Sequence, residues 1–122
     1  MQIISFILVL IVALEHLYIL ALEMFFSTSK AAEKSFGVPK SVLQMKEVQT
    51  LFANQGLYNG FLAAGLFWGL FFAPAAFATS VILFFLSCVI IAALFGTFTA
   101  SKGILIKQGI PAMLALIFVI LV

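Results

Sequence analysis

Three ionisable side chains interrupt an otherwise apolar N-terminal segment. Glu15, His16 and Glu23 lie within residues 1–26, a stretch that is apolar enough to span a bilayer. Ionisable groups at that depth are costly, so they are usually turned inward, partnered or put to use. A carboxylic acid beside an imidazole, which titrates near neutral pH, can form a proton site or a receptor for an amine-bearing ligand.

Polar residues on the next apolar segment extend this pattern. At about 100° per residue, the two glutamates and the histidine share one face of the first helix. On the second helix, Asn54 aligns with Tyr58, and Gln55 and Asn59 form a second row beside them. Such a polar stripe is not expected to face lipid. We therefore predict a polar cavity with this ligand- or proton-binding set: Glu15, His16, Tyr18, Glu23, Asn54, Gln55, Tyr58, Asn59, Lys107 and Gln108.

Two other interpretations of these residues stay open. The central polar groups could only hydrogen-bond one another and fix the packing of the helices. Glu23 and Glu47, with Lys46 and Lys107, lie near the ends of apolar segments, where we expect side chains that reach toward the interface or form ion pairs.

The elements that must position these groups follow from composition. The chain has 122 residues, of which 66% are hydrophobic and 8% charged, with a mean hydropathy of +1.34. These values lie outside the range of soluble domains and predict an integral membrane protein. The fold class we expect is all-α, a four-helix membrane bundle in a single transmembrane domain over residues 1–122. The predicted spans are 2–26, 47–72, 77–99 and 103–122, with a cytoplasmic loop over 27–46.

The lysines set the expected topology. All six flank apolar segments and fall on one side of a four-span arrangement, which the positive-inside rule makes cytoplasmic. Both termini are then outside, and the basicity is no sign of nucleic-acid binding. The polar residues of the four spans lie in the cytoplasmic half, so the predicted cavity opens to that side. The lysines are Lys30, Lys34, Lys40, Lys46, Lys102 and Lys107.

Prolines and glycines mark the local breaks. Phe36-Gly37-Val38-Pro39 predicts a turn within the loop, with short interfacial helices on either side. Pro111 falls inside the fourth span, where it should kink the helix and free the carbonyl of Lys107. Asn54-Gln55-Gly56-Leu57 is echoed by Lys107-Gln108-Gly109-Ile110, which indicates either a parallel duplication of a helical hairpin or a chance match.

The sequence gives little support for a bound metal or cofactor. One histidine and one cysteine, Cys88, supply no recognisable metal motif, and a haem with two axial histidines is excluded. Phosphate-loop and nucleophile-elbow motifs are absent from the sequence. We therefore expect no metal and no cofactor, and a protein that is not an enzyme is favoured.

The longer motifs resemble a known group. Glu15-His16-Leu17-Tyr18, Asn54-Gln55-Gly56-Leu57-Tyr58-Asn59-Gly60 and Gln108-Gly109-Ile110-Pro111 resemble a family of small bacterial four-helix membrane proteins of unknown function. The resemblance implies a multi-pass protein of the bacterial cytoplasmic membrane and brings no activity. A more distant likeness to the DoxX-like group is one of fold alone.

Three classes of function remain at this stage. The first is the binding of a small cationic or amphipathic molecule, with transport coupled to protons as an extension. The second is an intramembrane enzyme that acts on a lipid or isoprenoid by acid/base chemistry. The third is a membrane scaffold or accessory subunit. The expected partners are the lipid bilayer and a small molecule, and a homo-oligomer stays open.

Overall fold

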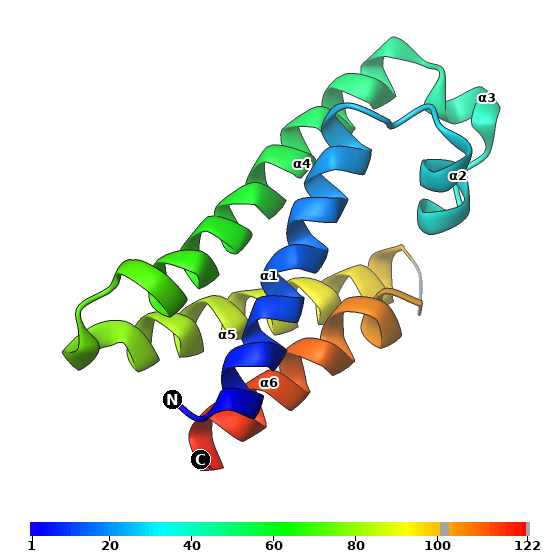
Figure 1. The fold of residues 1–122 in the computed structure, drawn as a ribbon. Helices are drawn as coiled ribbons and strands as arrows, with labels where there is room; N and C mark the ends of the chain where they lie inside the picture. The colour runs from blue at the N-terminus through cyan, green and yellow to red at the C-terminus, as the bar shows by residue number, and fades with distance from the viewer. Residues whose placement is uncertain (101–102, 122) are drawn as a thin grey trace. The chain divides into compact units, whose positions relative to one another are not determined.

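All regular secondary structure in the described part of the chain is helical. The computed structural model describes residues 1–100 and 103–121 (Figure 1). Two π-helical segments extend the α-helices, η1 (Trp68–Phe72) after α4 and η2 (Leu105–Gly109) before α6. The all-α prediction is confirmed, and the four-helix membrane bundle stays a prediction. The helices are α1 (Ile3–Met24), α2 (Lys30–Phe36), α3 (Lys40–Leu43), α4 (Lys46–Phe67), α5 (Ala75–Thr99) and α6 (Ile110–Leu121).

Two of these helices are long and apolar enough to cross a bilayer. They are α1, with 22 residues and a mean hydropathy of 2.5, and α5, with 25 residues and a mean hydropathy of 2.7. The apolar helix Leu105–Leu121 is shorter. The middle of α4 carries Asn54, Gln55 and Asn59, which lower the hydropathy of this helix. Length and composition thus mark two candidate membrane spans.

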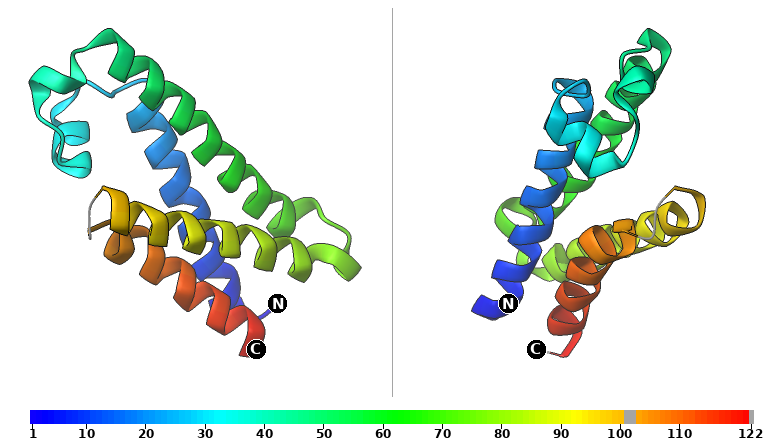
Figure 2. Two further views of the ribbon diagram at one scale, coloured as in Figure 1. Left: turned by 180° about the vertical axis from the view of Figure 1, so that it is seen from behind. Right: turned by 90° about the vertical axis from the view of Figure 1, so that its right-hand side faces the viewer.

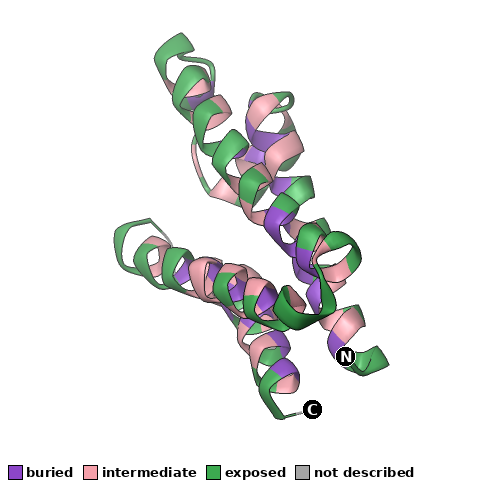
Figure 3. Cartoon of the chain, turned by 90° about the vertical axis from the view of Figure 1, so that its left-hand side faces the viewer, coloured by how far each residue is buried: buried purple, intermediate pink, exposed green. Residues whose placement is uncertain are grey.

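The chain forms two compact units. The first contains Met1–Glu15 and the described residues from Leu62 onward, and the second is His16–Phe61. In the first unit, α5 and α6 run side by side (Figure 2). Buried positions recur along one side of these helices (Figure 3). Four helices supply the core of this unit: α1 gives Val9, Val12 and Ala13, α4 gives Leu66, α5 gives Ile82, Leu86 and Val89, and α6 gives Ala112, Ala115 and Val119.

Pro111 is accommodated by a wider turn. It is the second residue of α6, directly after the π-helical segment η2, where the backbone N–H of Ile110 donates to the carbonyl of Leu105. A proline has no N–H to donate, and its ring crowds the carbonyl four residues back. A π turn bonds each residue to one five positions back, so it widens the helix at that point. The helix thus continues through Pro111, and the kink expected at this residue stays a prediction.

The segment 27–46 is folded around two short helices of the second unit. The Ser29 hydroxyl accepts the backbone N–H of Ala32 at 3.1 Å and caps the start of α2. Gly37 ends α2 in the left-handed region, at φ +65°, and its N–H donates to the carbonyl of Glu33 at 3.0 Å. Pro39 then precedes α3. The turn predicted from these residues is present, with a helix on each side of it.

Gly37→Ala tests the role of this turn. Nothing lies within 4 Å of the position that a Cβ would take, so the substitution adds only backbone strain. A left-handed alanine costs about 1 kcal/mol, which corresponds to roughly five-fold faster amide exchange if opening is local. Hydrogen–deuterium exchange over residues 30–43 measures this change. Gly37→Asn is the control, because asparagine tolerates this conformation, and it should exchange nearly as slowly as the wild type.

Candidate functional site: a buried carboxylate held by two amides

Two helices approach closely within the second unit. The last turns of α1 lie beside the first half of α4 in both ribbon views (Figures 1 and 2). Gly56 of α4 makes this approach possible, because a Cβ there would lie 2.9 Å from the Cβ of Glu23 and 3.2 Å from the carbonyl oxygen of Leu20. A glycine in contact with a neighbouring helix allows the two backbones to come together.

Glu23 is the centre of this contact. Its side chain is fully buried, at 0% exposure. The amide Nε2 of Gln55 donates to its Oε2 at 2.6 Å, and the amide Nδ2 of Asn59 donates to its Oε1 at 2.6 Å. The two amides are four residues apart on α4 and therefore lie on one face of that helix. Each oxygen of the carboxyl group thus has one donor from α4.

The carboxyl group of Glu23 has no ion pair within the described residues. Among residues 1–100 and 103–121, the only hydrogen bonds or ion pairs of the Glu23 side chain are those from Gln55 and Asn59. An ionised carboxylate has about four lone-pair positions, so two donors leave it able to accept more. Two neutral amides orient the carboxylate but bring no positive charge.

The structure corrects the expectation for Glu23. One of the two interpretations, that this side chain reaches toward the interface or forms an ion pair, was wrong, whereas its place in the ligand- or proton-binding set stays a prediction. Glu23 is buried and its partners are amides, because Gly56 brings the backbone of α4 against the last turn of α1.

The two polar rows of α4 differ in their surroundings. Gln55, which is itself exposed, and Asn59, which is half-buried, donate to the carboxylate, whereas Asn54 and Tyr58 are exposed on another face of the helix, Tyr58 at 59%. The ring of Tyr58 contacts Phe61 edge to face, with centroids 5.8 Å apart. The inward orientation expected for Asn54 and Tyr58 stays a prediction.

The other predicted site residues are distributed over both units. Glu15 belongs to the first unit and is half-buried, and its Oε1 is shielded with no hydrogen-bond partner among the described residues. His16 begins the second unit and is buried, while Tyr18 is exposed. Lys107 and Gln108 lie in η2 of the first unit. The structure thus brings together Glu23, Gln55 and Asn59, and the role of the remaining residues stays a prediction.

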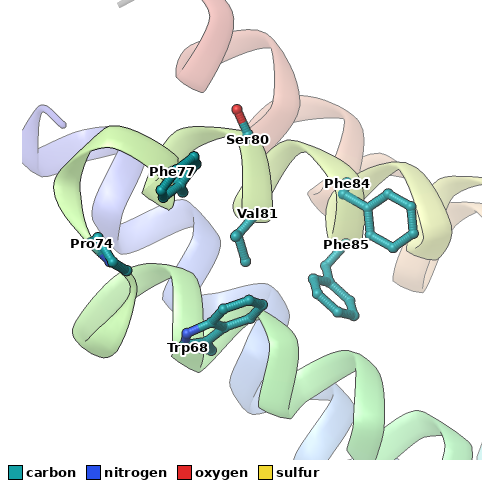
Figure 4. Close-up of a pocket in the computed structure, with 7 residues that line it drawn as sticks. All are labelled: Trp68, Pro74, Phe77, Ser80, Val81, Phe84 and Phe85. Carbon is teal, nitrogen blue, oxygen red and sulfur yellow. The ribbon is translucent and has the colours of Figure 1, made fainter.

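An apolar groove in the first unit was not anticipated from the sequence. It has a volume of about 540 Å³ and lies around the turn that joins η1 to α5 (Figure 4). Trp68, the first residue of η1, forms part of its wall. Aromatic side chains dominate the lining, which consists of Trp68, Pro74, Phe77, Ser80, Val81, Phe84 and Phe85.

The arrangement of the possible metal ligands can also be examined. Among the described residues, no group of three histidine, cysteine, aspartate or glutamate side chains is close enough to hold a metal ion. The chemistry that this site offers is that of a buried carboxylate with oriented amides. Such a group can accept hydrogen bonds from a cationic donor or take up a proton.

Fold and site define an all-α protein with two candidate membrane spans and a buried carboxylate. Comparison with known proteins then places the chain more closely. It belongs to the family described as "Protein of unknown function (DUF1304)", whose model matches residues 10–120. It is 43% identical over 117 residues to the uncharacterised protein YpaA of Lactococcus lactis subsp. lactis (strain IL1403), which covers 96% of this chain and 97% of that protein.

No solved structure matches the chain. The family and the relative agree with the expected resemblance to proteins of unknown function, and neither brings an activity. Nothing in these comparisons supports the more distant likeness to the DoxX-like group.

Proposed function

We propose that this chain is a multi-pass protein of the cell membrane that binds a small cationic or amphipathic molecule at Glu23. The apolar helices α1 and α5 support the membrane location, and the lysine bias of the sequence supports a topology with both termini outside. The apolar helix Leu105–Leu121 and the continuous helix formed by α4 and η1 provide the other two spans of this proposal.

The observation that carries the binding proposal is the uncompensated carboxylate. A buried ionised group is unfavourable unless it is paired and hydrogen-bonded. Glu23 has hydrogen bonds from two neutral amides and no cationic partner in the described residues. It also lies in the last turn of α1, where the helix dipole disfavours a negative charge. A bound cation would offset both the cost of burying an unpaired negative charge and the unfavourable interaction of that charge with the helix dipole.

The same carboxyl group offers a simple route to proton coupling. A proton and an organic cation each neutralise one negative charge, so they compete for Glu23. Release of the proton on one side of the membrane and of the cation on the other would then exchange the two. Glu15 and His16, earlier in the same helix, are the groups through which we propose that a proton passes.

Binding of phenethylamine, a small amphipathic amine, tests the proposal. We expect Glu23→Gln to weaken binding by at least roughly ten-fold, because charge-assisted hydrogen bonds are about twice as strong as neutral ones. Glu47→Gln is the matched control, since it removes the same charge from an exposed residue of α4. Calorimetric titration of the purified protein measures both, with 2-phenylethanol as the uncharged analogue.

Two results would count against this proposal. Equal affinities of phenethylamine for the wild type and for Glu23→Gln would show that the carboxylate does not bind the amine. Equal affinities of the wild type for phenethylamine and 2-phenylethanol would show that charge is not recognised. Native mass spectrometry of the protein from its own membrane adds a direct readout, a bound mass present in the wild type and absent in Glu23→Gln. If the Glu23→Gln variant, the uncharged analogue and mass spectrometry all fail to show binding, a role as a membrane scaffold becomes the better proposal.

A further inference from the structure

The segment between α1 and α4 is a folded structure with its own buried residues. We call residues 30–46, which contain α2 and α3, the basic cap. Ala32 and Leu43 are fully buried, and the ring of Phe36 stacks on that of Phe52 with centroids 5.1 Å apart. Together with the turn at Gly37, these contacts give the basic cap a defined outer face.

Lysines dominate that outer face. The basic cap contains four lysines and one acidic residue, Glu33. All four lysines are exposed. Lys30 and Lys34 are one turn apart on α2, so they share a side of that helix. The four are Lys30, Lys34, Lys40 and Lys46.

Two apolar side chains are exposed among these lysines. Val42 is 36% exposed and Met45 is 49% exposed, whereas Leu43 between them points inward. Lys40 and Lys46 stand on either side of this pair in the sequence. Exposed apolar side chains flanked by lysines are typical of segments that lie in a membrane interface.

The position of the basic cap in the chain favours the same surface. It follows directly after α1, a candidate membrane span, and the residues at that junction, Phe25 and Phe26, are 69% and 58% exposed. Aromatic residues at the end of an apolar helix are typical of the level where hydrocarbon meets headgroups. The basic cap would then begin within reach of the headgroups.

We infer that the basic cap binds the anionic phospholipid headgroups of the leaflet from which α1 emerges, with Val42 and Met45 inserted below them. This inference rests on the proposed membrane location and not on ligand binding at Glu23. The lysines supply charge complementary to the headgroup phosphates, at about 1 kcal/mol for each lysine near an anionic surface. Burial of the apolar side chains of Val42 and Met45 below the headgroups adds to the affinity of the segment for the membrane.

A probe at position 42 tests the inference in the full-length protein. The variant Val42→Cys with Cys88→Ser has a single thiol, which is labelled with the fluorophore NBD. The labelled protein is placed in nanodiscs of phosphatidylcholine alone or with one third phosphatidylglycerol. We expect a blue-shifted emission and at least roughly three-fold slower quenching by dithionite in the anionic nanodiscs.

Charge variants identify the groups responsible. Lys34→Gln together with Lys40→Gln should remove most of the difference between the two lipid compositions, as should a high salt concentration. Lys107→Gln is the matched control, because it removes an exposed cation outside the basic cap, and it should leave the difference unchanged. An equally accessible probe in both lipids, or an effect of Lys107→Gln equal to that of the pair, would overturn the inference.

The lipid test of the basic cap can fail or succeed independently of the ligand-binding test at Glu23. Glu23→Gln should leave the response of the probe to phosphatidylglycerol intact, since the cap does not depend on that carboxylate. A protein that enters nanodiscs and binds phenethylamine, yet shows no lipid response at position 42, refutes the cap alone. A protein that cannot be placed in a bilayer refutes the membrane location on which both depend.

Discussion

Replacing Gln55 and Asn59 together with leucine is expected to lower the free energy of unfolding by about 3 kcal/mol. Both substitutions keep a side chain of similar volume against α1 but remove the two donors to Glu23. The carboxyl group is then buried with no hydrogen-bond partner. Reversible unfolding of the purified protein, followed by circular dichroism, measures the loss.

A third substitution separates loss of these hydrogen bonds from poor packing. If the cost comes from the stranded carboxyl group, adding Glu23→Leu should recover much of the stability, because an apolar trio needs no hydrogen bonds. A triple variant no more stable than the double variant would contradict this account. Asn54→Leu is the control for amide replacement on α4, because Asn54 is exposed, and it should change stability by less than about 0.5 kcal/mol.

Gly65→Ala is expected to lower the free energy of unfolding by about 2 kcal/mol through overpacking. A Cβ at Gly65 would meet three carbons of the Phe85 ring, on α5. An aromatic ring presents a rigid edge, so α4 and α5 would have to separate or the ring would have to leave its position. The melting temperature and the free energy of unfolding both report the change.

Two further variants show whether the ring is responsible. Phe85→Leu in the Gly65→Ala background should make the alanine less costly than it is beside phenylalanine. Gly60→Ala is the matched control, because the close contact of its Cβ would be with Cδ1 of Leu20, the end of a flexible side chain. Alanine is also favoured over glycine in a helix by about 1 kcal/mol, so Gly60→Ala should be neutral or stabilising. A similar loss in Gly60→Ala and Gly65→Ala would rule out the ring as the cause.

Helices were predictable from the sequence because apolar runs and breaking residues are local signals. Ser29 and Gly37 flank α2 with the side chain and backbone freedom that helix ends need, and Pro74 precedes α5. The π-helical segments η1 and η2 were not predicted, because apolar composition does not distinguish a π turn from an α turn. Pro111 indicated that the hydrogen bonding of the helix must change near this residue, but it did not indicate that the change would be a π turn.

The sequence singled out Glu23, Gln55 and Asn59 among ten candidate residues but did not indicate that these three meet. Spacing along α4 correctly separated Asn54 and Tyr58 from Gln55 and Asn59, but an angle within one helix does not say which row meets a neighbour. Gly56 marks the face of α4 that meets α1, because only a glycine lets the two backbones approach at this position. The burial of Glu23 depends on a contact between α1 and α4, and Gln55 lies 32 residues after Glu23 in the sequence, a separation that helical spacing does not bridge.

The π turn at η2 has a consequence for how this family can change in length. Small side chains of α6, Ala112 and Ala115, pack in the core beside α5. Loss of Pro111, which follows the π turn, would rotate the rest of α6 by about 100° and bring Met113 and Leu116 to those positions. The core could not hold them without separating the helices. Over evolution, then, loss of one residue should be accepted in η2, where it turns a π turn into an α turn, and purged from α6.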